Sequence, residues 1–67
     1  SNNIIEIHTD QQINYLNANK FLLQYVTDKK AQSFHYRLAA KSREDIEIIR
    51  KEIDKHEGVL NIEVRLS

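Results

Sequence analysis

Because the sequence contains no cysteine, three histidines, His8, His35 and His56, are its only soft metal donors. His8 and His35 occupy polar positions in two segments in which polar and apolar residues alternate. If these segments pair as strands, the imidazoles become neighbours, and Glu6 or Glu63 would complete a site of histidines and a carboxylate. We retain His8 and His35 as candidate metal ligands. The alternative, favoured because no two histidines share a short motif, is that all three are solvent-exposed.

Polar positions recur along the segments that read as strands, and they would share one face of a sheet. They are Glu6, His8, His35, Arg37, Asn61, Glu63 and Arg65. A face of mixed charge suits contact with another protein or with a second copy of the chain, and we expect His35, Arg37, Glu63 and Arg65 to form this interface. The alternative is cross-strand ion pairing in water, which contributes little stability. An exposed edge strand offers a second route to a dimer, by sheet extension.

Composition argues against several classes of function. Ten basic and ten acidic residues give a net charge of zero, whereas nucleic-acid-binding domains are usually strongly basic. The sequence has no nucleophile elbow and no glycine-bearing oxyanion loop, and 67 residues leave little room for a pocket. We therefore expect no enzyme, no catalytic residue and no cofactor. No apolar run approaches the length of a membrane span and no signal peptide is evident, so we expect a cytoplasmic location without direct membrane contact.

Three segments have the two-residue period of half-buried strands: Asn3–Thr9, Ser33–Lys41 and Val59–Leu66. Each would direct apolar residues to one face and polar residues to the other, as in a sheet covered on one side only. The residues expected to face inward are Ile5, Ile7, Phe34, Tyr36, Leu38, Ala40, Leu60, Ile62, Val64 and Leu66.

A helix is predicted between the second and third of these strands. Ser42 is a good N-cap, and Asp45 three residues later resembles a capping box. Ile46, Ile49 and Ile53 then recur at helical spacing. His56 would complement the C-terminal end of the helix, and Gly58, the only glycine, suits a left-handed residue just after it.

Residues 10–30 allow two interpretations. One is a kinked helix that starts after Asp10, breaks near Asn17 and Asn19, and resumes over Lys20–Lys30. The other is a short strand at Ile13–Leu16, followed by a helix capped by one of these asparagines. Asparagine is unfavourable inside both helices and strands, so a break is expected there in either case.

The order strand, helix, strand, helix, strand predicts a single α+β domain over residues 1–67, with three or four strands and two helices on one face. A crossover through the helix that begins after Ser42 would make the strands Ser33–Lys41 and Val59–Leu66 parallel. This arrangement corresponds to half of a ferredoxin-like sandwich.

The segment from Glu44 to Val64 resembles the ending of many ferredoxin-like regulatory modules. In these modules a helix closes with a small turn and leads into the last strand, which corresponds here to Gly58-Val59-Leu60-Asn61-Ile62-Glu63-Val64. These modules include ACT domains, heavy-metal-associated domains and the cytosolic C-terminal domains of magnesium-transporter-C-like membrane proteins. The heavy-metal type needs two cysteines, which this chain lacks, and ACT domains usually have a glycine-rich loop where this sequence has Thr9-Asp10-Gln11-Gln12. The remaining resemblance implies a regulatory or dimerising appendage of a bacterial membrane transport protein, with a second copy or the parent protein's own domains as its partner.

The chain opens with Ser1-Asn2 and no methionine, which resembles the remnant of an affinity tag, so we expect a piece excised from a longer protein. The alternative is a small complete protein. The sequence therefore favours a non-catalytic regulatory or dimerisation module. A metal- or ligand-sensing domain that uses His8 and His35, or a free-standing interaction adaptor, is the alternative.

Overall fold

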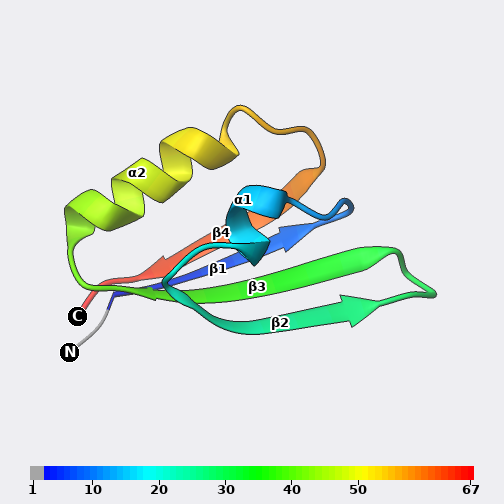
Figure 1. Ribbon diagram of the computed structural model, residues 1–67, viewed down its shortest axis with the longest axis horizontal. Helices are drawn as coiled ribbons and strands as arrows, with labels where there is room; N and C mark the ends of the chain where they lie inside the picture. The colour runs from blue at the N-terminus through cyan, green and yellow to red at the C-terminus, as the bar shows by residue number, and fades with distance from the viewer. Residues whose placement is uncertain (1–2) are drawn as a thin grey trace.

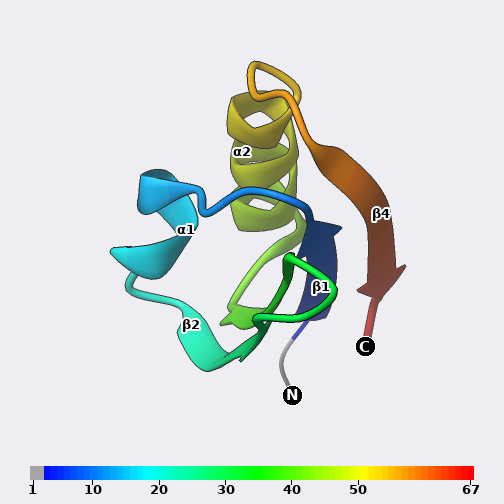
Figure 2. The same cartoon turned by 90° about the vertical axis from the view of Figure 1, so that its right-hand side faces the viewer.

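The computed structural model describes residues 3–67, so the expected remnant at residues 1–2 lies outside the described residues. The elements follow the order β1 (Asn3–Thr9), α1 (Asn14–Asn17), β2 (Leu22–Asp28), β3 (Ser33–Ala40), α2 (Arg43–Ile53) and β4 (Val59–Arg65). The small α+β fold is confirmed, with four strands in one sheet and both helices on the same face of that sheet (Figures 1 and 2).

The sheet has the strand order β2-β3-β1-β4, and each neighbouring pair is antiparallel. Because β1 lies antiparallel between β3 and β4, those two outer neighbours run parallel to each other, as the crossover through α2 requires. The two central strands are therefore β3 and β1, and α2 packs on both of them. β2 and β4 form the two edges of the sheet.

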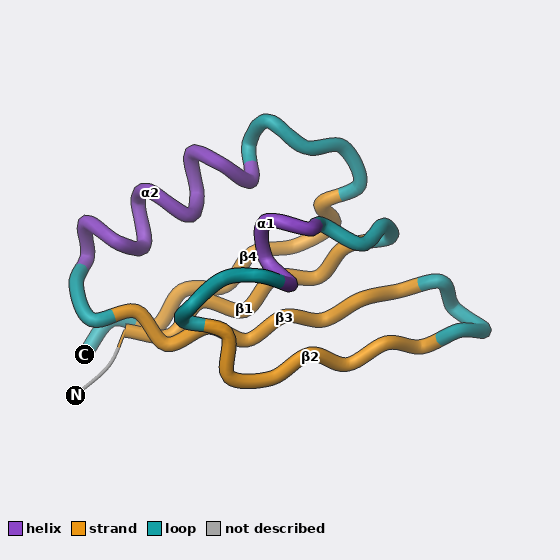
Figure 3. The backbone as a smooth tube through the Cα atoms, in the orientation of Figure 1, coloured by secondary structure: helices purple, strands orange, loops and turns teal. Residues whose placement is uncertain are grey.

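The expectation of a helix over Lys20–Lys30 is wrong, because Leu22–Asp28 forms strand β2 and pairs with β3. The hairpin between them turns without glycine or proline (Figure 3). Instead, Asp28 Oδ1 accepts hydrogen bonds from the backbone N–H groups of Lys30 and Ala31, at 3.0 and 3.2 Å. Gln32 then adopts the left-handed region with φ of 51°. The Asp28 side chain thus stabilises a turn that contains none of the glycine or proline residues by which turns are usually recognised in a sequence.

Helix α1 is a single turn, so both the kinked helix and the strand at Ile13–Leu16 are wrong. Its N-cap has no side-chain hydrogen bond. The Tyr36 hydroxyl, reaching from β3, accepts a hydrogen bond from the backbone N–H of Ile13 (3.1 Å) and donates one to Asn17 Oδ1 (2.7 Å). Burial of Tyr36 raises the pKa of its phenol above the ordinary value, since the phenolate would lose its solvation. One buried tyrosine therefore anchors α1 to the sheet.

The core lies between the sheet and the helices, where the apolar faces predicted for β1, β3 and α2 meet. Its fully buried members are Ile5, Ile7, Ile13, Leu16, Tyr36, Leu38, Ala40, Ile46, Ile49 and Ile53. Ser42 caps α2 as predicted, since its Oγ accepts a hydrogen bond from the N–H of Asp45 at 3.2 Å.

The burial expected along β4 is wrong for Leu60 and Leu66, which are 56% and 50% exposed, although Leu66 lies on the helix side, next to α2. The register explains Leu60: His8 pairs with Asn61 while Thr9 pairs with Val59, so Leu60 is the extra residue of a β-bulge. Leu66 lies beyond the last residue of β4. Ile62 and Val64, between them, do pack against the core.

Gly58 has the expected left-handed backbone, with φ of 84°. It does not directly follow α2, however, because the helix ends at Ile53 and turns intervene. Its carbonyl accepts a hydrogen bond from the N–H of Asp10 at 2.8 Å, and a Cβ at this position would collide with the Asp10 carboxylate. The backbone angle is what favours glycine here; a Cβ would in addition displace the exposed Asp10 side chain.

Candidate functional site

One whole face of the sheet is uncovered, because both helices pack on the opposite face (Figure 2). We call this surface the polar sheet face. It is formed by Glu6, His8, Gln24, Val26, His35, Arg37, Asn61, Glu63 and Arg65. A shallow depression of about 310 Å³ lies in it. The predicted interface residues His35, Arg37, Glu63 and Arg65 therefore do share one face.

The strand registers arrange most of these side chains in two rows across the sheet. The first row, from β2 to β4, is Gln24, Arg37, Glu6 and Glu63. The second row is Val26, His35, His8 and Asn61. Directly opposed residues on antiparallel strands are close enough to interact. Charge is thus concentrated in the first row, with the two histidines at the centre of the second.

Glu6 collects the cations of this face. Arg65 Nη2 lies 2.8 Å from Glu6 Oε1, and Arg37 Nε lies 3.8 Å from the same oxygen. The three side chains are 43–66% exposed, so solvent screens these pairs and they add little stability. Glu63 is different: its carboxylate accepts a hydrogen bond from Asn61 Nδ2 at 3.3 Å and has no ion pair with any of residues 3–67. The cations of the face are therefore shared unequally between its two carboxylates.

His8 and His35 are brought together, as predicted from the pairing of their strands. Their rings are stacked, with centroids 4.1 Å apart and planes inclined by 12°. A metal ion must lie in the plane of each coordinating ring, about 2.0–2.1 Å from its nitrogen. Two stacked rings direct their lone pairs along parallel planes and cannot meet at one ion without rotating. Within residues 3–67 no group of three or more histidine, cysteine, aspartate or glutamate side chains could hold a metal.

His8 also has an unsatisfied group: its Nε2 atom is buried and has no hydrogen-bond partner within the described residues. A buried polar atom without a partner normally costs stability. The two histidines therefore form a stacked pair in the sheet face, in which His8 Nε2 has no hydrogen-bond partner among residues 3–67.

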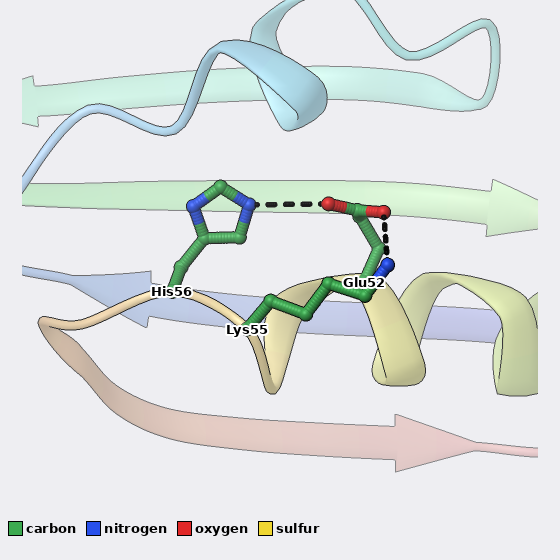
Figure 4. A network of polar contacts seen from close by, with 3 residues as sticks. All are labelled: Glu52, Lys55 and His56. Carbon is green, nitrogen blue, oxygen red and sulfur yellow. Dashed lines mark hydrogen bonds and ion pairs between the residues drawn. The ribbon is translucent and has the colours of Figure 1, made fainter.

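His56 lies away from this surface, beyond the C-terminal end of α2. Its Nε2 is 3.4 Å from Glu52 Oε2, and Lys55 Nζ is 3.4 Å from Glu52 Oε1 (Figure 4). His56 thus lies close to the helix end, where it was expected, and its ring contacts a carboxylate in the last turn; its effect on the helix dipole stays a prediction. Both contacts are long and accessible to solvent, so they add little stability to the end of the helix.

Gln24 and Val26 belong to the polar sheet face but were not predicted, because β2 was expected to be helical. Their alternation with Tyr25, whose ring is tilted by 33° against that of Tyr36 with centroids 5.0 Å apart, is the pattern that marks β2. That signal spans too few residues to be separated from a helical pattern.

Comparison of the chain with protein families, with curated proteins and with solved structures finds no match. Within residues 3–67, no helix has the length and apolar character needed to cross a membrane.

Proposed function

We propose that this chain is a non-catalytic interaction module that associates with a second copy of itself through the polar sheet face. The observation that carries this proposal is the open face itself: four strands with a balanced set of charges, on which no element of residues 3–67 packs. Domains of two layers normally bury one face of the sheet only. The open face here carries two arginines, a residue type enriched in protein interfaces, and each lies within 4 Å of a carboxylate.

Charge balance supports a second copy as the partner. Glu6 and Glu63 carry two negative charges, and Arg37 and Arg65 carry two positive charges. An isologous interface brings the same patch of both copies together, so each carboxylate can face an arginine of the other copy. A face with a single sign of charge would repel itself.

The size of the face limits the contact that a second copy can make. Four strands about 4.8 Å apart, each about seven residues long at about 3.4 Å per residue, cover roughly 450 Å². A typical stable interface buries about 800 Å² per partner. We therefore expect a weak dimer, in the micromolar range or weaker, whose population depends strongly on concentration.

The topology supports the finer assignment to the ferredoxin-like type. The element order β-α-β-β-α-β and the interleaved strand order β4-β1-β3-β2 correspond to that type, although α1 is only one turn long. Together with the resemblance over residues 44–64, this supports a regulatory module of ACT-like kind. On that resemblance we propose the cytoplasmic appendage of a bacterial membrane transport protein as its setting.

One observation favours a second candidate function, the sensing of a metal or small ligand. The unsatisfied His8 Nε2 lies in a ring that lines the depression in the sheet face, and a ligand that rotates the stacked rings could satisfy it. Zn²⁺, Ni²⁺ or an amino acid would then raise the melting temperature of the wild type and leave a His8→Ala, His35→Ala variant unchanged. A flat response of the wild type excludes this candidate.

The main proposal is tested by the solution mass of the chain over a concentration series. Light scattering is expected to show the mass rising from 7.9 kDa towards twice that value. Arg37→Glu places a carboxylate beside Glu6 in the middle of the face and is expected to lower the measured mass at every concentration of the series. Lys51→Glu makes the same change of charge on α2 and is expected to leave the dimer intact. A wild type that stays monomeric at millimolar concentration contradicts the proposal.

A further inference from the structure

Strand β4 is an open edge of the sheet. Within the described residues it pairs only with β1, and Figure 2 shows no element beyond it. The helix α2 packs on β1 and β3, and a groove of about 260 Å³ separates it from Val64 and Leu66. An open strand edge presents backbone N–H and C=O groups to any strand that approaches it.

The two halves of β4 differ in their ability to accept another strand. The bulge at Leu60 interrupts the regular ladder at the start of β4, and bulges are one of the devices that block edge pairing. The regular register runs from Asn61 to Arg65, and the exposed Leu66 follows it. A new strand would therefore pair with the second half of β4.

We propose that β4 pairs antiparallel with β4 of a second copy, about a two-fold axis that passes beside Val64. In this register Glu63 of each copy lies opposite Arg65 of the other, and Ile62 lies opposite Leu66. Shifting the axis to Glu63 or Arg65 brings two like charges directly opposite each other, which is destabilising. Of the registers centred on Glu63, Val64 and Arg65, only the one centred on Val64 places opposite charges across from each other.

The unequal sharing of charge on the sheet supplies an independent reason for this pairing. Glu63 pairs directly with Glu6 across β1 and β4, yet both nearby arginines contact Glu6. Glu63 is left without a cation and opposite a like charge. Arg65 of a second copy would neutralise it, and a guanidinium with five donors can hold both its own Glu6 and the Glu63 of the other copy.

The other edge lacks these features. Strand β2 contains no cationic residue, and its one carboxylate, that of Asp28, is engaged in the hairpin turn. Pairing through β4 would join two sheets into one of eight strands. It goes beyond the proposed function and does not rest on it: although Glu63 and Arg65 also belong to the polar sheet face, strand pairing needs only the open edge of β4.

Oxidative cross-linking tests the register, and the absence of native cysteine makes each introduced thiol unique. Directly opposed residues of antiparallel strands have Cα atoms about 4.5–5.5 Å apart, within the range that a disulfide bridges. The Val64→Cys variant is therefore expected to form a covalent dimer as its main product under mild oxidation. Ile48→Cys, at an exposed site on α2, is the matched control and is expected to give several-fold less.

Because Val64 is half-buried, its replacement could destabilise the fold, so a second pair of variants tests the same register at exposed positions. Glu63→Cys and Arg65→Cys replace exposed residues, and their mixture is expected to give a heterodimer that neither variant gives efficiently alone. Failure of both Val64→Cys and the mixture to cross-link overturns the proposal, as does a yield no higher than that of Ile48→Cys.

A combined variant distinguishes this inference from the proposed function. Adding Arg37→Glu to Val64→Cys changes the polar sheet face two strands away from the edge, so cross-linking is expected to continue even if association through the face is lost. Loss of the cross-link in the combined variant would show that the contact at residue 64 arises from the face, which overturns pairing through the edge.

Discussion

Replacing Tyr36 by phenylalanine removes one hydroxyl group from the core, and we expect this to lower the free energy of unfolding by about 2 kcal/mol. The Tyr36 hydroxyl makes two hydrogen bonds, from the N–H of Ile13 and to Asn17 Oδ1. In the Tyr36→Phe variant Asn17, which is exposed, regains water. The N–H of Ile13 cannot, because Ile13 is only 2% exposed.

The magnitude follows from this asymmetry. A buried donor left without a partner costs about 1–3 kcal/mol, whereas an exchanged exposed hydrogen bond costs little. Folded domains are stable by about 0.05–0.15 kcal/mol per residue, so the loss is a large fraction of the total for a chain of 67 residues. With a urea m-value of about 1 kcal/mol/M, the midpoint should fall by about 2 M.

Urea unfolding followed by circular dichroism measures this shift. Tyr25→Phe is the matched control, since the Tyr25 hydroxyl accepts a hydrogen bond from Gln12 Nε2 at the exposed surface. We expect the control to stay within about 0.5 kcal/mol of the wild type. If both variants unfold at the same urea concentration, the Tyr36 hydroxyl does not anchor α1 and the reasoning is refuted.

Three further changes test the local structure. Ser42→Ala removes the cap of α2 and is expected to cost about 1 kcal/mol in urea unfolding; an unchanged midpoint contradicts this. Gly58→Ala is expected to cost more than about 1 kcal/mol, because of its positive φ and the collision with Asp10, and an equal or higher melting temperature argues against it. Because burial raises the pKa of Tyr36 in the folded state, the associated stability is complete below about pH 10 and is lost as pH rises through the folded-state value. Unfolding measured against alkaline pH should show this loss in the wild type and a smaller one in Tyr36→Phe.

The parts of the fold that could be predicted from the sequence are those with a complete local signal. In α2 the cap Ser42 and three isoleucines at helical spacing all indicate the same element. Strand β3 alternates over its full length. By contrast, β2 follows Asn19 and ends in a turn made by an aspartate side chain, so no glycine or proline marks its limits.

The candidate site could be predicted only as far as the strands that form it. The contact of His8 with His35 follows from β1 and β3 alone. Gln24 and Val26 could not be assigned to the face until β2 was known to be a strand. The exposure of Leu60 depends on a bulge at the start of β4, and the alternating pattern of the residues that follow does not reveal it.

Glu63 occupies an unfavourable position in the single chain. It lies opposite the like-charged Glu6, and both nearby arginines contact Glu6 instead. Such conflicts between local rules and the fold are expected at functional positions. Glu63→Gln should therefore have two opposite effects. Removing the like charge should stabilise the monomer by roughly 0.2–1 kcal/mol in urea unfolding, while removing the partner of Arg65 in a second copy should weaken association in light scattering.

Glu47→Gln, which removes the same charge from the exposed side of α2, should change neither quantity appreciably. The opposite signs matter because a variant that merely damaged the fold would lower both stability and association. A Glu63→Gln chain that is less stable than the wild type, or that associates equally well, would show that this carboxylate is already satisfied in the single copy. Association of two copies would then not depend on the charge of Glu63.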